Sequence, residues 1–195
     1  MKERKAKIKR VTKETKIDIS LNLVKSKPVK FSNTIPFMNH MLELLAHHGK
    51  LSLSVKAQGD TYVDSHHLVE DLGIVLGQAI KKALGEKKGI NRYGNFLLPM
   101  DEALSYVAVD LSGRPFLDYS VKFKFQKSGF DFSLLKEFFY AFAINSGITL
   151  HISMRKGSNC HHIAESVFKG LGRALGEAIK LNSKQKGVPS TKGKL

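Results

Sequence analysis

The chain has 195 residues, of which 42% are hydrophobic and 25% are charged, and its 32 basic and 17 acidic residues give a net charge of +15. This composition is typical of globular proteins and argues against a largely disordered chain. The sequence holds no apolar run of the roughly 20 residues that a membrane-spanning helix needs, and no secretory signal follows its charged start. With a single cysteine, it also excludes an internal disulfide framework. We therefore expect a cytoplasmic protein that has no membrane partner.

The first half of the chain changes between strand-like and helix-like hydrophobic patterns. Apolar residues at every second position predict strands, and apolar residues three or four positions apart predict helices. Pro36 suits the first position of a helix, and Gly49 and Gly85 are typical of helix ends. The predicted elements are strands over 12–23, 29–31 and 51–57 and helices over 36–49 and 66–84.

The second half repeats this order after a stretch that the sequence marks as a loop. Residues 85–104 contain three glycines and a proline, so we predict a loop-rich connection there, with a boundary near 85–100. From Asn182 onward the tail is polar and rich in glycine and lysine. The predicted elements are strands over 105–110, 117–125 and 148–154 and helices over 134–142 and 161–181.

An internal repeat connects the two halves. HHLVEDLGIVLGQAI at 66–80 aligns with HHIAESVFKGLGRAL at 161–175 at a fixed offset of 95 residues, with the histidine pair, one glutamate and one glycine identical. Self-similarity of this kind indicates duplication. We therefore predict an α/β protein of the α+β type. It consists of two ββαβα halves, residues 1–90 and 91–195, with two sheets packed with helices into one catalytic unit.

Both copies of the repeat open with a histidine pair and a glutamate, in the pattern H-H-x-x-E. Glu70 lies four residues after His66 and three after His67, so it shares a helix face with either, and the second copy repeats this spacing at 161–165. Neighbouring histidines diverge by about 100° around a helix and suit two different ions better than one. Imidazole and carboxylate ligands without thiolates favour Mn, Fe, Zn or Ni. Seven of the eight histidines lie in three clusters, which are His40 with His47 and His48, His66 with His67, and His161 with His162.

Three other segments carry groups that bind anions. Arg92 and Arg114 lie in loops marked by glycine or proline, where a guanidinium can bind a phosphate through two hydrogen bonds. Near the C-terminus, PSTKG at 189–193 offers two hydroxyls and an ammonium. Each segment alone is more often a solvated surface feature. A phosphorylated small substrate would suit a site that contains these basic groups.

At these residues the chain resembles the imidazoleglycerol-phosphate dehydratase family, over nearly its whole length. The segments that carry the resemblance are RVTKETKIDISLNL, FMNHMLELLAHHG, DSHHLVEDLGIVLGQAI, GINRYG, PMDEAL, DLSGRPF, HHIAESVFKGLGRAL and PSTKG. The resemblance implies a fold of two similar halves, like the second domain of ribosomal protein S5. It also implies a homo-oligomer of 24 chains with active sites between subunits, and a Mn-dependent dehydration of D-erythro-imidazole-glycerol phosphate in histidine biosynthesis.

The same resemblance implies roles for particular residues and two Mn²⁺ ions in each site. One ion would take His40, His67, His161 and Glu165, and the other would take His66, Glu70, His162 and Glu137. The residues implied to contact substrate are Glu14, His40, His48, His66, Glu70, Arg92, Arg114, His161, Lys169, Ser190, Thr191 and Lys192. Among the catalytic residues that it implies, Glu14 is the acid–base group, and the others are His40, Glu70 and Glu165.

The chain departs from the family pattern at three positions. Glu137 stands where many relatives have a histidine, Asn39 stands where an aspartate commonly precedes the ligand histidine, and Val24 replaces a common aspartate. A carboxylate can still bind manganese, whereas an amide at 39 would orient a neighbouring ligand less strongly. A weakened homologue of the family is therefore one alternative.

Two further alternatives account for some of the features. The first ten and last sixteen residues hold eleven basic residues and one acidic residue, and a nucleic-acid-binding protein would use such ends. No aromatic residues are interleaved with these lysines, so we expect no nucleic-acid partner. A metallohydrolase could use the same ligands, but it would release a hydrolysis product, whereas a dehydratase conserves the phosphate.

Overall fold

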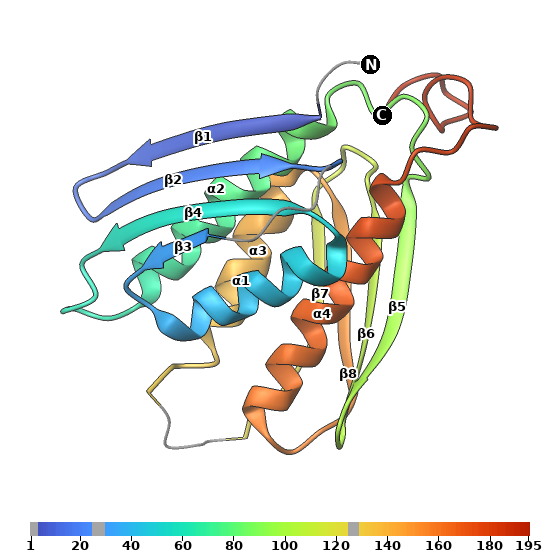
Figure 1. The fold of residues 1–195 in the computed structure, drawn as a ribbon. Coiled ribbons are helices and arrows are strands. Elements are labelled where there is room, and N and C mark those ends of the chain that lie inside the picture. The colour runs from blue at the N-terminus through green and yellow to red at the C-terminus, as the bar shows by residue number, and fades with distance from the viewer. Residues whose placement is uncertain (1–3, 25–29, 125–128) are drawn as a thin grey trace.

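The computed structural model describes residues 4–24, 30–124 and 129–195. Each half runs through three strands, a helix, a strand and a second helix (Figure 1). In chain order the elements are β1 (Lys5–Val11), β2 (Thr15–Asn22), β3 (Lys30–Asn33), α1 (Pro36–Gly49), β4 (Ser52–Gly59), α2 (His66–Leu84), β5 (Tyr93–Met100), β6 (Ala103–Asp110), β7 (Phe116–Ser120), α3 (Leu134–Ser146), β8 (Thr149–Lys156) and α4 (Cys160–Ile179).

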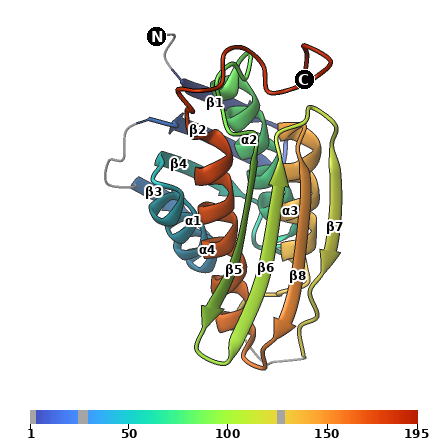
Figure 2. The same cartoon turned by 90° about the vertical axis from the view of Figure 1, so that its right-hand side faces the viewer.

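Two four-stranded sheets of identical topology enclose the helices, as the α+β prediction requires. The strand orders are β1-β2-β4-β3 and β5-β6-β8-β7, and in each sheet only the last pair is parallel. The helix α2 packs on the first sheet and against α3, while α4 packs on the second sheet and against α1. The helices therefore form a layer between the sheets, with the second sheet nearest the viewer in Figure 2. One apolar core spans both halves.

The repeat places equivalent residues at equivalent points of the two halves. The helices α2 and α4 begin at or next to the two histidine pairs. The glycine shared by both copies lies at a close helix crossing, because a Cβ on Gly77 would meet the carbonyl of Phe142 at 2.7 Å and one on Gly172 would meet that of Leu45 at 2.5 Å. The helix pairs α2–α3 and α1–α4 thus approach each other through small residues, and the α1–α4 pair carries the site described below.

The sequence predicted two strands before the first helix of each half, but the structure has three. The basic segment from Lys5 onward is β1, because its lysines face solvent while Ala6 is buried and Ile8 packs against the core. Residues 93–100, predicted as loop, form β5. This strand lies at the edge of its sheet and pairs only with β6, and an edge strand can contain a proline such as Pro99. At the other end of its sheet β7 stops at Ser120 rather than near 125. The positions 125 and 29, where predicted strands ended or began, lie outside the described residues.

Among the helices that the structure describes, none combines the length and apolar character needed to cross a membrane.

At Gly94 of β5 the second sheet packs closely against α4. A Cβ at this position would stand 1.9 Å from the carbonyl oxygen of Ala174, a backbone atom that cannot move without shifting the helix. We expect Gly94→Ala to lower the free energy of unfolding by at least about 3 kcal/mol, measured by denaturant titration. The control is Gly129→Ala, where no described atom lies within 4 Å of the added carbon. Equal stability of the two variants would contradict this packing.

Candidate functional site

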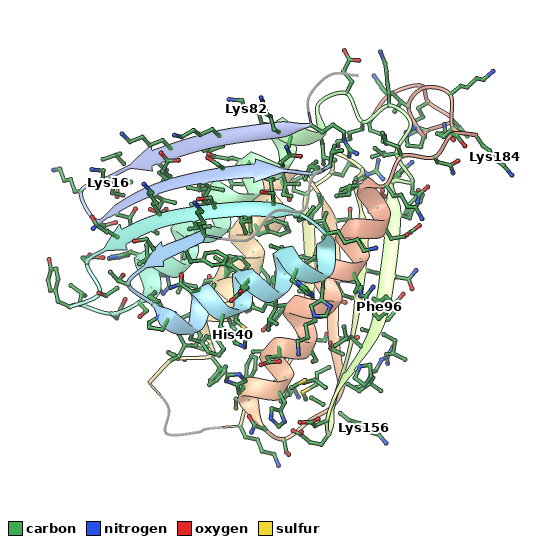
Figure 3. The ribbon with its side chains drawn as sticks, in the orientation of Figure 1. Lys16, His40, Lys82, Phe96, Lys156 and Lys184 are labelled. Carbon is green, nitrogen blue, oxygen red and sulfur yellow. The ribbon has the colours of Figure 1, made fainter. Side chains whose placement is uncertain are left out.

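Three side chains with metal-binding atoms converge where α1 crosses α4. The Nε2 atom of His40 lies 2.9 Å from Oε1 of Glu165, and Nε2 of His161 lies 3.0 Å from the same oxygen. One ligand atom from each side chain lies within 4.8 Å of the others, which is close enough to share one ion. His40 is on the side of α1 that faces α4 (Figure 3). We call this group the α1–α4 cluster.

The start of α4 is fixed by a cap that sets the direction of its histidines. The side-chain oxygen of Asn159 accepts hydrogen bonds from the backbone N–H groups of His161, at 2.8 Å, and His162, at 3.4 Å. This cap satisfies two of the N–H groups that every helix start leaves open. From there the i,i+4 spacing brings His161 onto the same face as Glu165.

Glu165 is ionised in this environment. Burial alone would raise the pKa of its carboxyl group, but hydrogen bonds from Lys169, His40 and His161 outweigh burial and lower the pKa to about 2. The Nζ atom of Lys169 donates to Oε2, the second carboxylate oxygen. An anionic oxygen beside two imidazole nitrogens is a donor set that suits a divalent transition-metal ion, so the residues fit such a metal.

The second histidine of the α4 pair points to other partners. The Nδ1 atom of His162 lies 2.7 Å from Oε2 of Glu102 and 3.8 Å from Oδ2 of Asp101, both in the turn between β5 and β6. The hydrogen bond to Glu102 raises the pKa of the His162 imidazole. His161 and His162 therefore diverge, as their adjacent positions on a helix predict.

A second group of site residues lies around the start of α2, and we call it the α2 cluster. His66 Nε2 lies 3.7 Å from Glu70 Oε2, and His67 Nδ1 lies 3.0 Å from Asp60 Oδ2. The hydrogen bond to Asp60, together with the charge of nearby Glu14, raises the pKa of His67. The backbone also ties these segments, since the N–H of Asp60 donates to the carbonyl of Glu14 at 3.1 Å.

Within one chain, the two ligand sets implied by the resemblance are only partly assembled. Three of the four ligands of the first ion are in the α1–α4 cluster, whereas His67 bonds to Asp60 in the α2 cluster. The second set is spread over three places. His66 and Glu70 are in the α2 cluster, His162 is beside Glu102, and Glu137 is half-buried in the first turn of α3.

The residues predicted to bind phosphate meet around Asp110, at the end of β6. Its carboxylate accepts two hydrogen bonds from Arg92, at 2.7 and 3.1 Å, and lies 3.8 Å from an Nη atom of Arg114. Arg92 also donates to the carbonyl of Pro189 at 2.9 Å, which draws the C-terminal tail to this place. Ser190 is partly buried, Thr191 and Lys192 are exposed, and the N–H of Lys192 donates to Ser190 Oγ at 3.2 Å.

The last two predicted substrate contacts are Lys169 and His48, which lie along the contact between α1 and α4. Lys169 belongs to the α1–α4 cluster, where it pairs with Glu165. His48 lines a cavity of about 620 Å³ between the C-terminal ends of α1 and α4, together with Arg4, Lys50 and Arg173. Burial and then the nearby positive charges lower the pKa of His48.

Several residues of these groups were missed by sequence reasoning. Asp60, Glu102 and Asp110 each hold a predicted site residue in place, at 3.0, 2.7 and 2.7 Å. Glu102 and Asp110 occur within quoted segments, PMDEAL and DLSGRPF, but periodicity gave no reason to choose them. Their partners are 60 and 18 residues away in the sequence, so no local spacing could have signalled the contacts.

Comparisons with known proteins identify related sequences and a matching fold. The family description "Imidazoleglycerol-phosphate dehydratase" matches residues 33–175. Proteins of that name from Endomicrobium trichonymphae and Methylorubrum populi are 60% identical over 193 residues and 52% identical over 194 residues, and each alignment covers at least 98% of both chains. The crystal structure of the protein of that name from Staphylococcus aureus matches this chain with a TM-score of 0.83 at 40% identity, and the match covers 91% of this chain and 99% of that one. The crystal structure from Pyrococcus furiosus, in complex with (S)-C348, has a TM-score of 0.84 at 38% identity, covering 96% and 100%.

Proposed function

This chain belongs to the imidazoleglycerol-phosphate dehydratase family, and we propose that it works with two Mn²⁺ ions held between copies of the chain. It is a hydro-lyase of histidine biosynthesis that removes water from D-erythro-imidazole-glycerol phosphate to give imidazole-acetol phosphate. The observation that carries the metal proposal is the α1–α4 cluster, in which two imidazole nitrogens and an ionised carboxylate can share one ion.

The reaction needs an electron sink, because no carbonyl group stands beside the carbon that loses its proton. The imidazole ring of the substrate is the part that can take up these electrons. A bound divalent cation supplies Lewis-acid stabilisation of the negative charge that develops there. The residues proposed to hold the ions are His40, His67, His161 and Glu165 for one, and His66, Glu70, Glu137 and His162 for the other.

The protein side chains supply binding and proton transfer. We assign Glu14, exposed in the turn before β2, as the acid–base group, because this turn is hydrogen-bonded to Asp60, the partner of His67 in the α2 cluster. Arg92, Arg114 and the tail residues Ser190, Thr191 and Lys192 would hold the phosphate. Their support is the arrangement around Asp110, which accepts two hydrogen bonds from Arg92 and lies 3.8 Å from an Nη atom of Arg114, so that two guanidinium groups stand together beside the C-terminal tail.

A second copy of the chain would complete the metal sites. In one chain His67 is engaged with Asp60 rather than His40, and the side chains of His66 and Glu70 remain 44% and 45% exposed. Exposed ligands on one surface and an incomplete ligand set on another favour a site built between subunits. We infer a homo-oligomer of 24 copies, as in the family, located in the cytoplasm and without a nucleic-acid partner.

Metal removal tests this proposal directly. We expect the protein to lose dehydration activity when it is dialysed against a chelator and to regain it with Mn²⁺, at two ions per chain by elemental analysis. Without the ion, the ligand side chains alone cannot stabilise the negative charge that develops on the substrate, so we expect the metal-free protein to be inactive. Full activity in metal-free protein would refute the metal assignment. Release of inorganic phosphate would favour the metallohydrolase, and steeply salt-dependent retention of nucleic acid on a filter would favour the nucleic-acid-binding alternative.

A further inference from the structure

The turn between β5 and β6 brings a carboxylate to the start of α4. Met100 pairs with Ala103 across a two-residue turn, which Asp101 makes possible by adopting a positive φ of 47°. Glu102, the second residue of the turn, therefore projects from a rigid hairpin rather than from a long loop. Its partners lie 56 to 60 residues further along the chain.

Both oxygens of Glu102 are used. Oε1 accepts hydrogen bonds from the backbone N–H groups of Ser158, at 3.1 Å, and Asn159, at 2.8 Å. Oε2 lies 2.7 Å from Nδ1 of His162. A carboxylate ion only accepts hydrogen bonds, so the hydrogen of the neutral imidazole is on Nδ1 and the lone pair of Nε2 is left to bind a cation.

The duplicated half shows how this arrangement differs from its counterpart. The turn of the first hairpin in each half ends with a glutamate, which is Glu14 in the first half and Glu102 in the second. His67 in the first half is the counterpart of His162 in the second. In the first half Nδ1 of His67 is held by Asp60, from the segment between β4 and α2, while Glu14 stays exposed. The second half uses its hairpin glutamate to hold the histidine. The two hairpin glutamates therefore have different surroundings, one exposed to solvent and one bound to a histidine.

We propose that Glu102 is a positioning residue, which fixes the ring and the tautomer of His162 so that Nε2 binds one of the two ions. This inference rests on the proposed metal centre and adds to it a residue outside both ligand sets. Carboxylates that hold the second nitrogen of a ligand histidine are typically worth a 10- to 100-fold change in metal affinity.

The test measures Mn²⁺ binding to the full-length protein by electron paramagnetic resonance of the free ion. We expect Glu102→Ala and Glu102→Gln to weaken one of the two ions by roughly 10- to 100-fold and to leave the other unchanged. The matched control is Asp101→Asn, which removes the neighbouring carboxylate, 71% exposed and 3.8 Å from the same Nδ1, but keeps the hydrogen bond. We expect the control to bind both ions as the unmodified protein does.

The thermal unfolding of the metal-free variants distinguishes two roles of Glu102. It can position the His162 ring, or it can only anchor the loop at 158–159. Glu102→Gln keeps the shape of the side chain, so its loss of one ion should come with little change in the apo melting temperature. Equal weakening of both ions together with a lower apo melting temperature would overturn the proposal in favour of loop anchoring. Two unchanged ions in Glu102→Ala would also overturn it, whereas an unmodified protein that binds no Mn²⁺ would refute the proposed metal centre itself.

Discussion

Glu165→Gln should lower the turnover number by roughly 10³-fold. Glu165 is the shared member of the α1–α4 cluster, 2.9 Å from His40 and 3.0 Å from His161. Glutamine keeps the size of the side chain but removes the negative charge that attracts the cation. It also leaves the ammonium group of Lys169, whose side chain is only 16% exposed, without its carboxylate partner. The measurement is turnover at saturating Mn²⁺ together with the number of bound ions.

The matched control for this substitution is Glu43→Gln, an identical change at an exposed position of α1. Its turnover and metal content should equal those of the unmodified enzyme. A Glu165→Gln enzyme that keeps both ions and more than a tenth of the original turnover would contradict the assignment of Glu165 as a ligand. A variant that loses one ion and its activity together supports the assignment.

The duplication could be predicted from the sequence because it depends on regular spacing. The H-H-x-x-E motif occurs at the start of both long helices, and the structure places those helices at equivalent points of two identical sheet topologies. The alternating strands β2, β4, β6 and β8 lie in the middle of their sheets, where one face packs against the core and gives a two-residue period. Central strands and amphipathic helices therefore follow from the sequence alone.

The edge strands could not be predicted in the same way. β5 has only two buried residues among eight, and it includes Gly94 and Pro99, which usually mark loops. β1 is dense in lysine, a pattern that is typical of a solvated tail and also of a protected sheet edge. At such positions pairing with a neighbouring strand decides the structure, and local sequence contains little information about that neighbour.

The site shows the same division between local and distant contacts. The i,i+4 pair of His161 and Glu165 could be predicted from helix geometry. The contact of His40 with Glu165 joins residues 125 positions apart, and only resemblance to a family suggested it. Glu102 and Asp110 were missed because their partners come from distant segments of the chain. Residues that position a ligand are therefore harder to find from sequence than the ligands themselves.

The other large effect concerns Glu14, for which we expect kcat to fall by roughly 10²- to 10⁴-fold on replacement by glutamine. Glutamine cannot exchange a proton at neutral pH, whereas its similar length preserves the turn before β2. The carbonyl of residue 14 that binds the N–H of Asp60 belongs to the backbone and is retained, so His67 keeps its partner Asp60. KM and the number of bound Mn²⁺ ions should consequently stay close to those of the unmodified enzyme. Steady-state kinetics and elemental analysis measure these quantities.

Lys13→Gln is the control for disturbance of the turn itself, because Lys13 is the exposed neighbour of Glu14. This variant should keep its kcat, which would show that the loss in Glu14→Gln comes from the carboxylate. If Glu14→Gln also lost an ion, its role would be to hold the α2 cluster rather than to transfer a proton. An unchanged kcat would instead assign the proton transfer to another group near the metals. The separation of kcat from metal content therefore decides whether the exposed hairpin glutamate acts on the substrate, in contrast to Glu102, which the second half uses to hold a histidine.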